Sequence, residues 1–314
     1  MDVVSIRAVS RSLWREVGLY VAAASAPVGV LAFVAHIAGG LADAPWVPPV
    51  AMLMPMVAAI VVQRFVAHRP ILRADGLGIR IGRLSVTLLA FPIVAALVIA
   101  AFAIGGAIDP AAIKSAATLA GGNLRLALPD LGGPFATLGV GLLITIFIAP
   151  VVNLPLMLGE EVGWRGFLTP RLVALLGKRG VVVAGVIWAA WHLPMIALGY
   201  NYPQHPVLGF AVFVPLCVAL SILFTAFANA GRSVLAAAIA HGVLNQVATF
   251  MMVAFVVEAR WIDWLQAPTG LAALAVFAGP AAWIYVRRPD LLVARPITAG
   301  GKRGPVRPLS PAAA

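Results

Sequence analysis

The sequence predicts an all-α, polytopic membrane protein with about eight transmembrane helices and with both termini in the cytoplasm. Of its 314 residues, 62% are hydrophobic and only 11% are charged, whereas soluble domains carry roughly 25% charged residues. The apolar runs are continuous and reach about 20 residues, the length that a helix needs to cross a hydrocarbon core of ~30 Å. Because these runs do not alternate with a period of two, we expect helices and not the strands of a membrane barrel.

Eight apolar runs have the length of a transmembrane helix. We place them at residues 17–35, 47–67, 84–104, 135–158, 181–198, 207–228, 233–257 and 270–286. The first run follows three arginines, as in a secretory signal, but it is longer than the apolar core of about 7–15 residues in such a signal. Its small residues also lie inside the run and not after it. We therefore interpret it as a transmembrane helix.

The basic residues indicate the orientation of these helices. All but three of the 22 Lys and Arg residues fall on one side of the predicted map, and the exceptions are Lys114, Arg125 and Arg260. Basic residues accumulate in cytoplasmic loops, so this asymmetry predicts an even number of spans with both chain ends in the cytoplasm. The net charge of +11 is spread over short segments between apolar runs, so we expect no nucleic-acid partner.

The chain divides into four parts. Residues 1–134 hold the first three spans and an arginine-rich segment, 68–83, that we expect at the cytoplasmic membrane surface. Residues 135–257 hold the next four spans and most of the polar intramembrane residues, and residues 258–286 hold the final span. Residues 287–314 are basic and rich in Pro and Gly, which predicts a disordered cytoplasmic tail near anionic lipid.

Two of the four glutamates in the chain, Glu160 and Glu161, are adjacent at the end of the fourth span. Charged side chains inside a membrane cost at least about 2.5–3.5 kcal/mol at its centre, so they normally face the bundle interior and serve a function. On a continuous helix Glu161 and Arg165 share a face, whereas Glu160 points about 100° away. We expect Glu161 to pair with Arg165 and Glu160 to be free for chemistry, and a purely structural salt bridge is the alternative.

Two later spans carry the remaining candidate residues. His192 lies about a dozen residues into the fifth span, one turn after Trp188, while His241 and Asn245 share one face of the seventh span. Both spans enter the membrane from the same side, so we expect the two histidines to reach comparable depths near Glu160. Taken singly, such residues are more often helix-packing contacts, worth about 1 kcal/mol or less, than catalytic groups.

Together these residues resemble a family, the CAAX protease and bacteriocin-processing (CPBP) intramembrane endopeptidases, which include the type II CAAX prenyl endopeptidases. The family motifs EExxxR, aromatic-xxx-His and HxxxN appear here as Glu160, Glu161 and Arg165, as Trp188 and His192, and as His241 and Asn245. The resemblance covers approximately residues 135–250. The aromatic position usually holds Phe, so Trp188 is a departure that affects the packing beside His192.

The resemblance implies an intramembrane endopeptidase that hydrolyses membrane-anchored peptide or protein substrates in a cavity open to the cytoplasm. Glu160 would act as general base, with His192 helping to hold or deprotonate the water. His241 and Asn245 would donate hydrogen bonds to the oxyanion, a contribution of about 3–4 kcal/mol per donor in soluble proteases. Arg165 would orient the carboxylates.

The residues leave other mechanisms and functions open. Glu160, His192 and His241 with an open water position also match catalytic zinc ligation, although no HExxH segment is present. A metal-assisted and a metal-free mechanism are therefore both compatible with the sequence. Buried Glu and His could instead relay protons in a proton- or ion-coupled transporter, or serve packing in a non-catalytic membrane scaffold. The absence of a visible internal repeat disfavours an inverted-repeat transporter.

The lipid bilayer is the surrounding that the apolar spans predict for this protein. A preference for Arg over Lys and abundant Ala and Gly are typical of a GC-rich genome, which favours the plasma (inner) membrane of a bacterium. Neither the physiological substrate nor the oligomeric state follows from the sequence.

Overall fold

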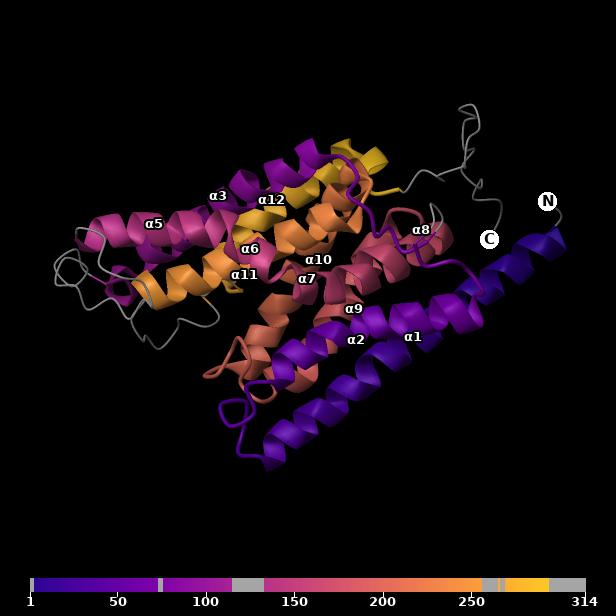
Figure 1. The fold of residues 1–314 in the computed structure, drawn as a ribbon, viewed down its shortest axis with the longest axis horizontal. Helices are drawn as coiled ribbons and strands as arrows, with labels where there is room; N and C mark the ends of the chain where they lie inside the picture. The colour runs from indigo at the N-terminus through magenta and orange to yellow at the C-terminus, as the bar shows by residue number, and fades with distance from the viewer. Residues whose placement is uncertain (1–2, 73–75, 115–132, 256–264, 266–268, 294–314) are drawn as a thin grey trace.

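The computed structural model of the protein describes residues 3–72, 76–114, 133–255, 265 and 269–293, and within these ranges its regular elements are helices (Figure 1). Their bounds are α1 (Val3–Ile37), α2 (Val47–Val61), η1 (Val62–Val66), α3 (Leu84–Ile108), η2 (Pro110–Ala112), α5 (Pro134–Phe147), α6 (Ala149–Val152), α7 (Leu154–Glu161), η3 (Val162–Leu168), α8 (Thr169–Leu176), α9 (Arg179–Ile196), α10 (Pro206–Gly231), α11 (Val234–Phe255), α12 (Leu271–Arg287) and η5 (Pro289–Leu291).

Within the described ranges, seven helical stretches are long and apolar enough to cross a membrane. They are Val9–Ile37, Val47–Val66, Leu84–Ile108, Phe135–Val152, Arg179–Ile196, Pro206–Gly231 and Val234–Phe255. α12 is an eighth apolar helix of 17 residues, at the lower limit of roughly 17–25 residues for a spanning helix. The all-α prediction is confirmed for the described residues, and each predicted span except the fourth coincides with one apolar helix. Residues 256–257 of the predicted seventh span and residues 294–314 of the predicted tail lie outside the described residues.

The fourth span differs from the single helix expected at 135–158. It is divided into α5, α6 and α7, and a π-helix, η3, follows directly. Pro150 lies in the first turn of α6, and Pro155 lies in the first turn of α7. A proline has no amide hydrogen to donate and its ring clashes with the preceding turn, so each proline interrupts the helix there. The two breaks turn α7 and η3 toward the interior of the bundle.

Glycines allow α7 and η3 to pack closely against α1 and α2. A Cβ on Gly159 would lie 2.6 Å from the carbonyl oxygen of Met52, and a Cβ on Gly163 would lie 2.5 Å from the hydroxyl of Tyr20. Neither distance is compatible with a side chain, and small residues are the usual means by which membrane helices approach closely. This packing sets the position of the neighbouring glutamates, Glu160 and Glu161.

In Figure 1, α1 and α2 lie side by side along one edge of the bundle, α3, α5 and α12 lie along the opposite edge, and α7, α9, α10 and α11 lie between them. Helix α2 packs against α7, α9 packs against α10, and α11 packs against α3 and α7. The central helices are the most buried and carry the predicted site residues.

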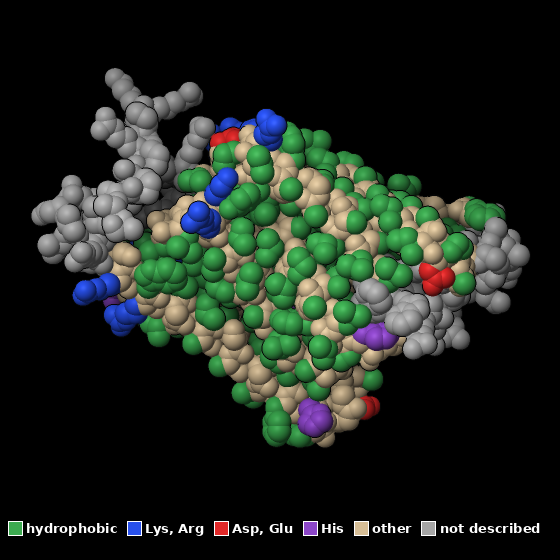
Figure 2. Space-filling view, turned by 180° about the vertical axis from the view of Figure 1, so that it is seen from behind, with side chains coloured by type: hydrophobic (Ala, Val, Ile, Leu, Met, Phe, Trp, Pro, Cys, Tyr) green, Lys and Arg blue, Asp and Glu red, His purple; other side chains and the backbone are tan. Residues whose placement is uncertain are grey.

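The basic residues gather at one end of the bundle, which we call the arginine end (Figure 2). Its described basic residues include Arg11, Arg15, Arg64, Arg69, Arg80, Arg83, Arg171, Lys178, Arg179, Arg232, Arg287 and Arg288. Hydrogen bonds join the segments there, from Arg80 Nε to the carbonyl of Arg232 at 2.6 Å and from Lys178 Nζ to the carbonyl of Tyr285 at 3.2 Å. Beyond this end the visible surface is largely hydrophobic, as contact with lipid requires.

Candidate active site

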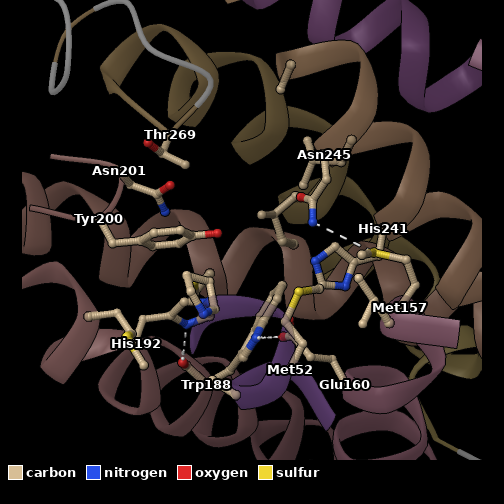
Figure 3. A pocket seen from close by; sticks show the side chains of 18 of the residues that line it. Met52, Met157, Glu160, Trp188, His192, Tyr200, Asn201, His241, Asn245 and Thr269 are labelled. Carbon is tan, nitrogen blue, oxygen red and sulfur yellow. Dashed lines mark hydrogen bonds between the residues drawn. The ribbon is translucent and has the colours of Figure 1, made fainter. Parts of the chain in front are cut away.

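A cavity of about 290 Å³ in the middle of the bundle contains the predicted site residues (Figure 3). α2, α7, α9, α10 and α11 line it, and Glu160, His192, His241 and Asn245 all contribute to its wall. The convergence of three polar helices that we expected from the sequence is therefore present. Most of the remaining lining is apolar, which is the usual composition of a ligand pocket with a few convergent polar groups.

Glu160 faces this cavity and is held by two indole groups. Its Oε2 accepts hydrogen bonds from Trp188 Nε1 at 2.8 Å and from Trp164 Nε1 at 3.2 Å. Both donors are uncharged, so they orient the carboxylate without a cation to neutralise it. Our sequence analysis missed Trp164, although its i,i+4 spacing from Glu160 is the same relation that linked Glu161 to Arg165.

Glu161 has a different environment. It is fully buried and does not line the cavity. Its Oε1 lies 3.0 Å from Arg165 Nη1 and 2.9 Å from His241 Nδ1. The expected pair with Arg165 is thus present, and the contact with His241 is an addition that the sequence did not predict. Both glutamates are buried, but Glu160 lines the cavity, whereas Glu161 lies behind it and is paired with Arg165 and His241.

Arg165 is enclosed by aromatic rings. Its guanidinium carbon lies 4.6 Å from the centre of the Trp188 ring and 5.2 Å from that of Phe224. Both distances are within the range of a cation–π interaction. The Trp188 indole also donates a hydrogen bond to Glu160. The same ring therefore contacts Glu160 and Arg165, the partner of Glu161.

The ring nitrogens of the two histidines have defined roles. His192 Nδ1 lies 2.9 Å from the carbonyl oxygen of Trp188, and His241 Nδ1 lies 2.9 Å from the Glu161 carboxylate. Carbonyl and carboxylate oxygens can only accept, so Nδ1 carries a hydrogen in both rings. When the imidazole of His192 is neutral, its Nε2 consequently presents a lone pair.

His241 and Asn245 lie next to each other on α11 (Figure 3). The His241 ring stacks on Phe224 with a centroid distance of 5.4 Å and meets the edge of Trp188 at 5.4 Å. Asn245 Nδ2 lies 3.7 Å from Met157 Sδ, which is a weak acceptor. The Asn245 amide is therefore held in the cavity by a contact that a stronger acceptor can replace.

The candidate zinc ligands do not form a metal-binding cluster. Among the described residues, no three His, Cys, Asp or Glu side chains lie close enough to hold a metal ion. Glu160 is oriented by the two indoles, and the Nδ1 atoms of His192 and His241 bond to separate oxygens. In this arrangement the three residues do not fit a zinc site, so we derive no chemical step through a metal.

A second polar group lies at the other end of the cavity. Tyr200, Asn201 and Thr269 line it there (Figure 3), and our sequence analysis singled out none of them because polar residues after a span are ordinary. Burial raises the pKa of Tyr200 to about 12, and the charge of Glu160 contributes to the rise. The Tyr200 hydroxyl therefore stays protonated and can donate a hydrogen bond into the cavity.

The fold and the site define a membrane-embedded helical protein with a buried carboxylate–imidazole centre. Residues 135–247 match the family model of the type II CAAX prenyl endopeptidases described as Rce1-like. The match begins at the start of α5 and includes all three motifs, so the resemblance noted from the sequence is confirmed over these residues. It indicates protease activity. A comparison with curated proteins gives no match.

Proposed function

We propose that the protein is an intramembrane endopeptidase that hydrolyses a peptide bond of a membrane-associated substrate, with Glu160 as the general base. One observation carries the proposal: Glu160 faces the cavity with two uncharged donors, whereas Glu161 is paired with Arg165. A carboxylate that lacks a cation partner in a poorly solvated site is suited to accept a proton from water.

The proposed reaction assigns a step to each residue. Glu160 takes a proton from a water that the Nε2 lone pair of His192 also holds, and the hydroxide attacks the carbonyl carbon of the substrate. The resulting oxyanion accepts a hydrogen bond from the Asn245 amide and, when Nε2 of His241 carries a proton, from that ring. The C–N bond then breaks as protonated Glu160 returns its proton to the amine leaving group.

Glu161, Arg165 and Trp188 have supporting roles in this proposal. Glu161 holds the His241 ring at 2.9 Å, and Arg165 neutralises Glu161 at 3.0 Å. Trp188 keeps the Glu160 carboxylate directed at the cavity. The name of the matched family suggests prenylated C-terminal peptides as one substrate class, and the apolar lining suits any uncharged segment of a membrane-anchored protein. We place the enzyme in a bacterial plasma membrane.

The test is cleavage of a library of membrane-anchored peptides by the purified protein in detergent. Wild type is compared with Glu160→Gln, with His192→Ala and with Asp43→Asn, a matched acid-to-amide change on an exposed loop. We expect cleavage to be lost in the first two variants, and the control to resemble wild type. A strong chelator and added zinc are included as separate arms, and the proposed mechanism predicts insensitivity to both.

Two other results would contradict the proposed mechanism or function. Cleavage by Glu160→Gln at the wild-type rate removes Glu160 as the base. A folded wild type that cleaves no peptide, but whose transport of ions or protons depends on Glu160, supports the transporter alternative instead.

A further inference from the structure

The cavity extends from Glu160 away from the arginine end. α2 contributes Pro48 and Met52 from its first two turns, and α9 contributes His192 and Met195 from its last two. On α11 the lining reaches Thr249 in the second half of the helix. α2 ends at the arginine end, and α9 and α11 begin there. The lining residues named above therefore lie on the parts of these helices that are far from the arginine end. The cavity therefore leads toward the end of the bundle that carries few basic residues.

Packed side chains fill the bundle on the other side of the site. Trp164 and Phe167 of η3, and Leu77 of the segment beneath η3, are each at most 2% exposed. A buried ion pair also joins α8 to α1 there, with 2.7 Å between Arg171 Nε and Glu16 Oε2. A peptide approaching Glu160 from the arginine end would have to displace this core.

The distribution of charge relates these two ends to the two faces of the membrane. Among the described residues, Lys114, which bonds to the carbonyl of Val253, lies away from the arginine end, and the other basic residues lie at or toward it. Such an excess of basic residues marks the cytoplasmic side. The rim formed by Tyr200, Asn201 and Thr269 lies at the opposite end (Figure 3). From the resemblance we expected a cavity open to the cytoplasm, and the distribution of charge favours the opposite direction.

We propose that the substrate of this site is an uncharged, extended segment of an exported or membrane-anchored protein, which reaches Glu160 from the non-cytoplasmic face past Tyr200 and Asn201. The inference rests on the proposed peptidase function. The described lining contains no Lys, Arg or Asp. Apart from the site residues Glu160, His192 and His241, it therefore offers no charged group that could pair with a charged substrate segment. A cavity of about 290 Å³ is at the small end of ligand pockets and accommodates a short stretch of chain, not a folded domain.

Cysteine accessibility tests the direction of the cavity without any need for activity. In a Cys217→Ala background, which removes the only cysteine, Gln246→Cys and Thr249→Cys each place a thiol in the cavity wall, and Arg287→Cys places one at the exposed arginine end. A membrane-impermeant maleimide is added to spheroplasts and to inverted membrane vesicles. We expect both cavity thiols to be labelled at least tenfold faster in spheroplasts, and Arg287→Cys to be labelled faster in inverted vesicles.

Several outcomes overturn the inference. Labelling of the cavity thiols from the inverted vesicles, or equally from both sides, contradicts access from the non-cytoplasmic face. Absence of labelling from both sides contradicts an open cavity, provided that the detergent-solubilised variants elute as folded protein. Labelling of Arg287→Cys in spheroplasts contradicts the orientation itself.

Sided cleavage then separates this inference from the proposed function. An anchored, uncharged peptide is presented either at the outer face of spheroplasts or at the exposed face of inverted vesicles. Cleavage only at the outer face supports both proposals, and cleavage only in inverted vesicles overturns the sidedness while the peptidase stands. If neither preparation cleaves but the labelling pattern is as expected, the peptidase proposal fails and the direction of access is still supported.

Discussion

Trp188 donates its indole N–H to Oε2 of Glu160 at 2.8 Å. In the family that the chain resembles this position usually holds Phe, which has no hydrogen to donate. The same indole lies over Arg165 and touches the rings of His192 and His241 at centroid distances of 5.9 and 5.4 Å. The departure at residue 188 therefore affects the orientation of the candidate base as well as the packing beside His192.

Replacing Trp188 with Phe should lower kcat by roughly 10- to 100-fold with little change in KM. A hydrogen bond to a charged group contributes about 1.5–3 kcal/mol, and each 1.36 kcal/mol is tenfold in rate. Steady-state kinetics on the cleaved peptide measure the change. Trp283→Phe on α12, where the side chain is 57% exposed, is the matched control. If both variants keep the wild-type kcat, the indole hydrogen bond has no role in turnover.

The two adjacent glutamates should respond in opposite ways to the same isosteric change. Glu161→Gln removes the charge that pairs with buried Arg165, and breaking a buried pair typically costs about 3–5 kcal/mol. Glu160→Gln removes a charge held by neutral donors only, so we expect little loss of stability. Thermal unfolding in detergent compares the two variants. A lower midpoint for Glu160→Gln than for Glu161→Gln would contradict the division of roles.

Tyr200→Phe should raise KM severalfold. The ratio of kcat/KM in wild type to kcat/KM in the variant should stay constant from pH 6 to pH 10. Burial disfavours the charged phenolate, so the pKa of Tyr200 rises to about 12. The hydroxyl is consequently a donor throughout this interval, and its contribution declines only as the pH approaches that pKa. Profiles of kcat/KM against pH test this, with Tyr285→Phe at the arginine end as control. A ratio that changes near pH 10 would indicate an ordinary, solvated phenol.

The features that the sequence predicted correctly depend on local patterns. Long apolar runs identify spans whatever their neighbours are, and the i,i+4 relation of Glu161 and Arg165 holds for any helix through that segment. The approach of His192 and His241 followed from counting residues from a common membrane face. All of these inferences need only helical geometry and the position of the basic loops.

The features that it missed depend on tertiary packing. The bond between Glu161 and His241 joins residues 80 positions apart, and no local periodicity encodes it. The breaks at Pro150 and Pro155, in contrast, could have been inferred from the missing amide hydrogens.

Gly159→Ala should reduce both stability and activity although it adds a single methyl group. The new Cβ would lie 2.6 Å from the Met52 carbonyl oxygen, so α7 must move away from α2 and carry the adjacent Glu160 with it. Overpacking of this kind costs about 1–3 kcal/mol. Gly18→Ala on α1 is the matched control, because its Cβ would meet nothing within 4 Å and Ala is favoured over Gly in helices. We expect the unfolding midpoint and kcat to fall for Gly159→Ala, and the midpoint to be unchanged or higher for Gly18→Ala. Equal behaviour of the two variants would mean that α2 does not set the position of Glu160.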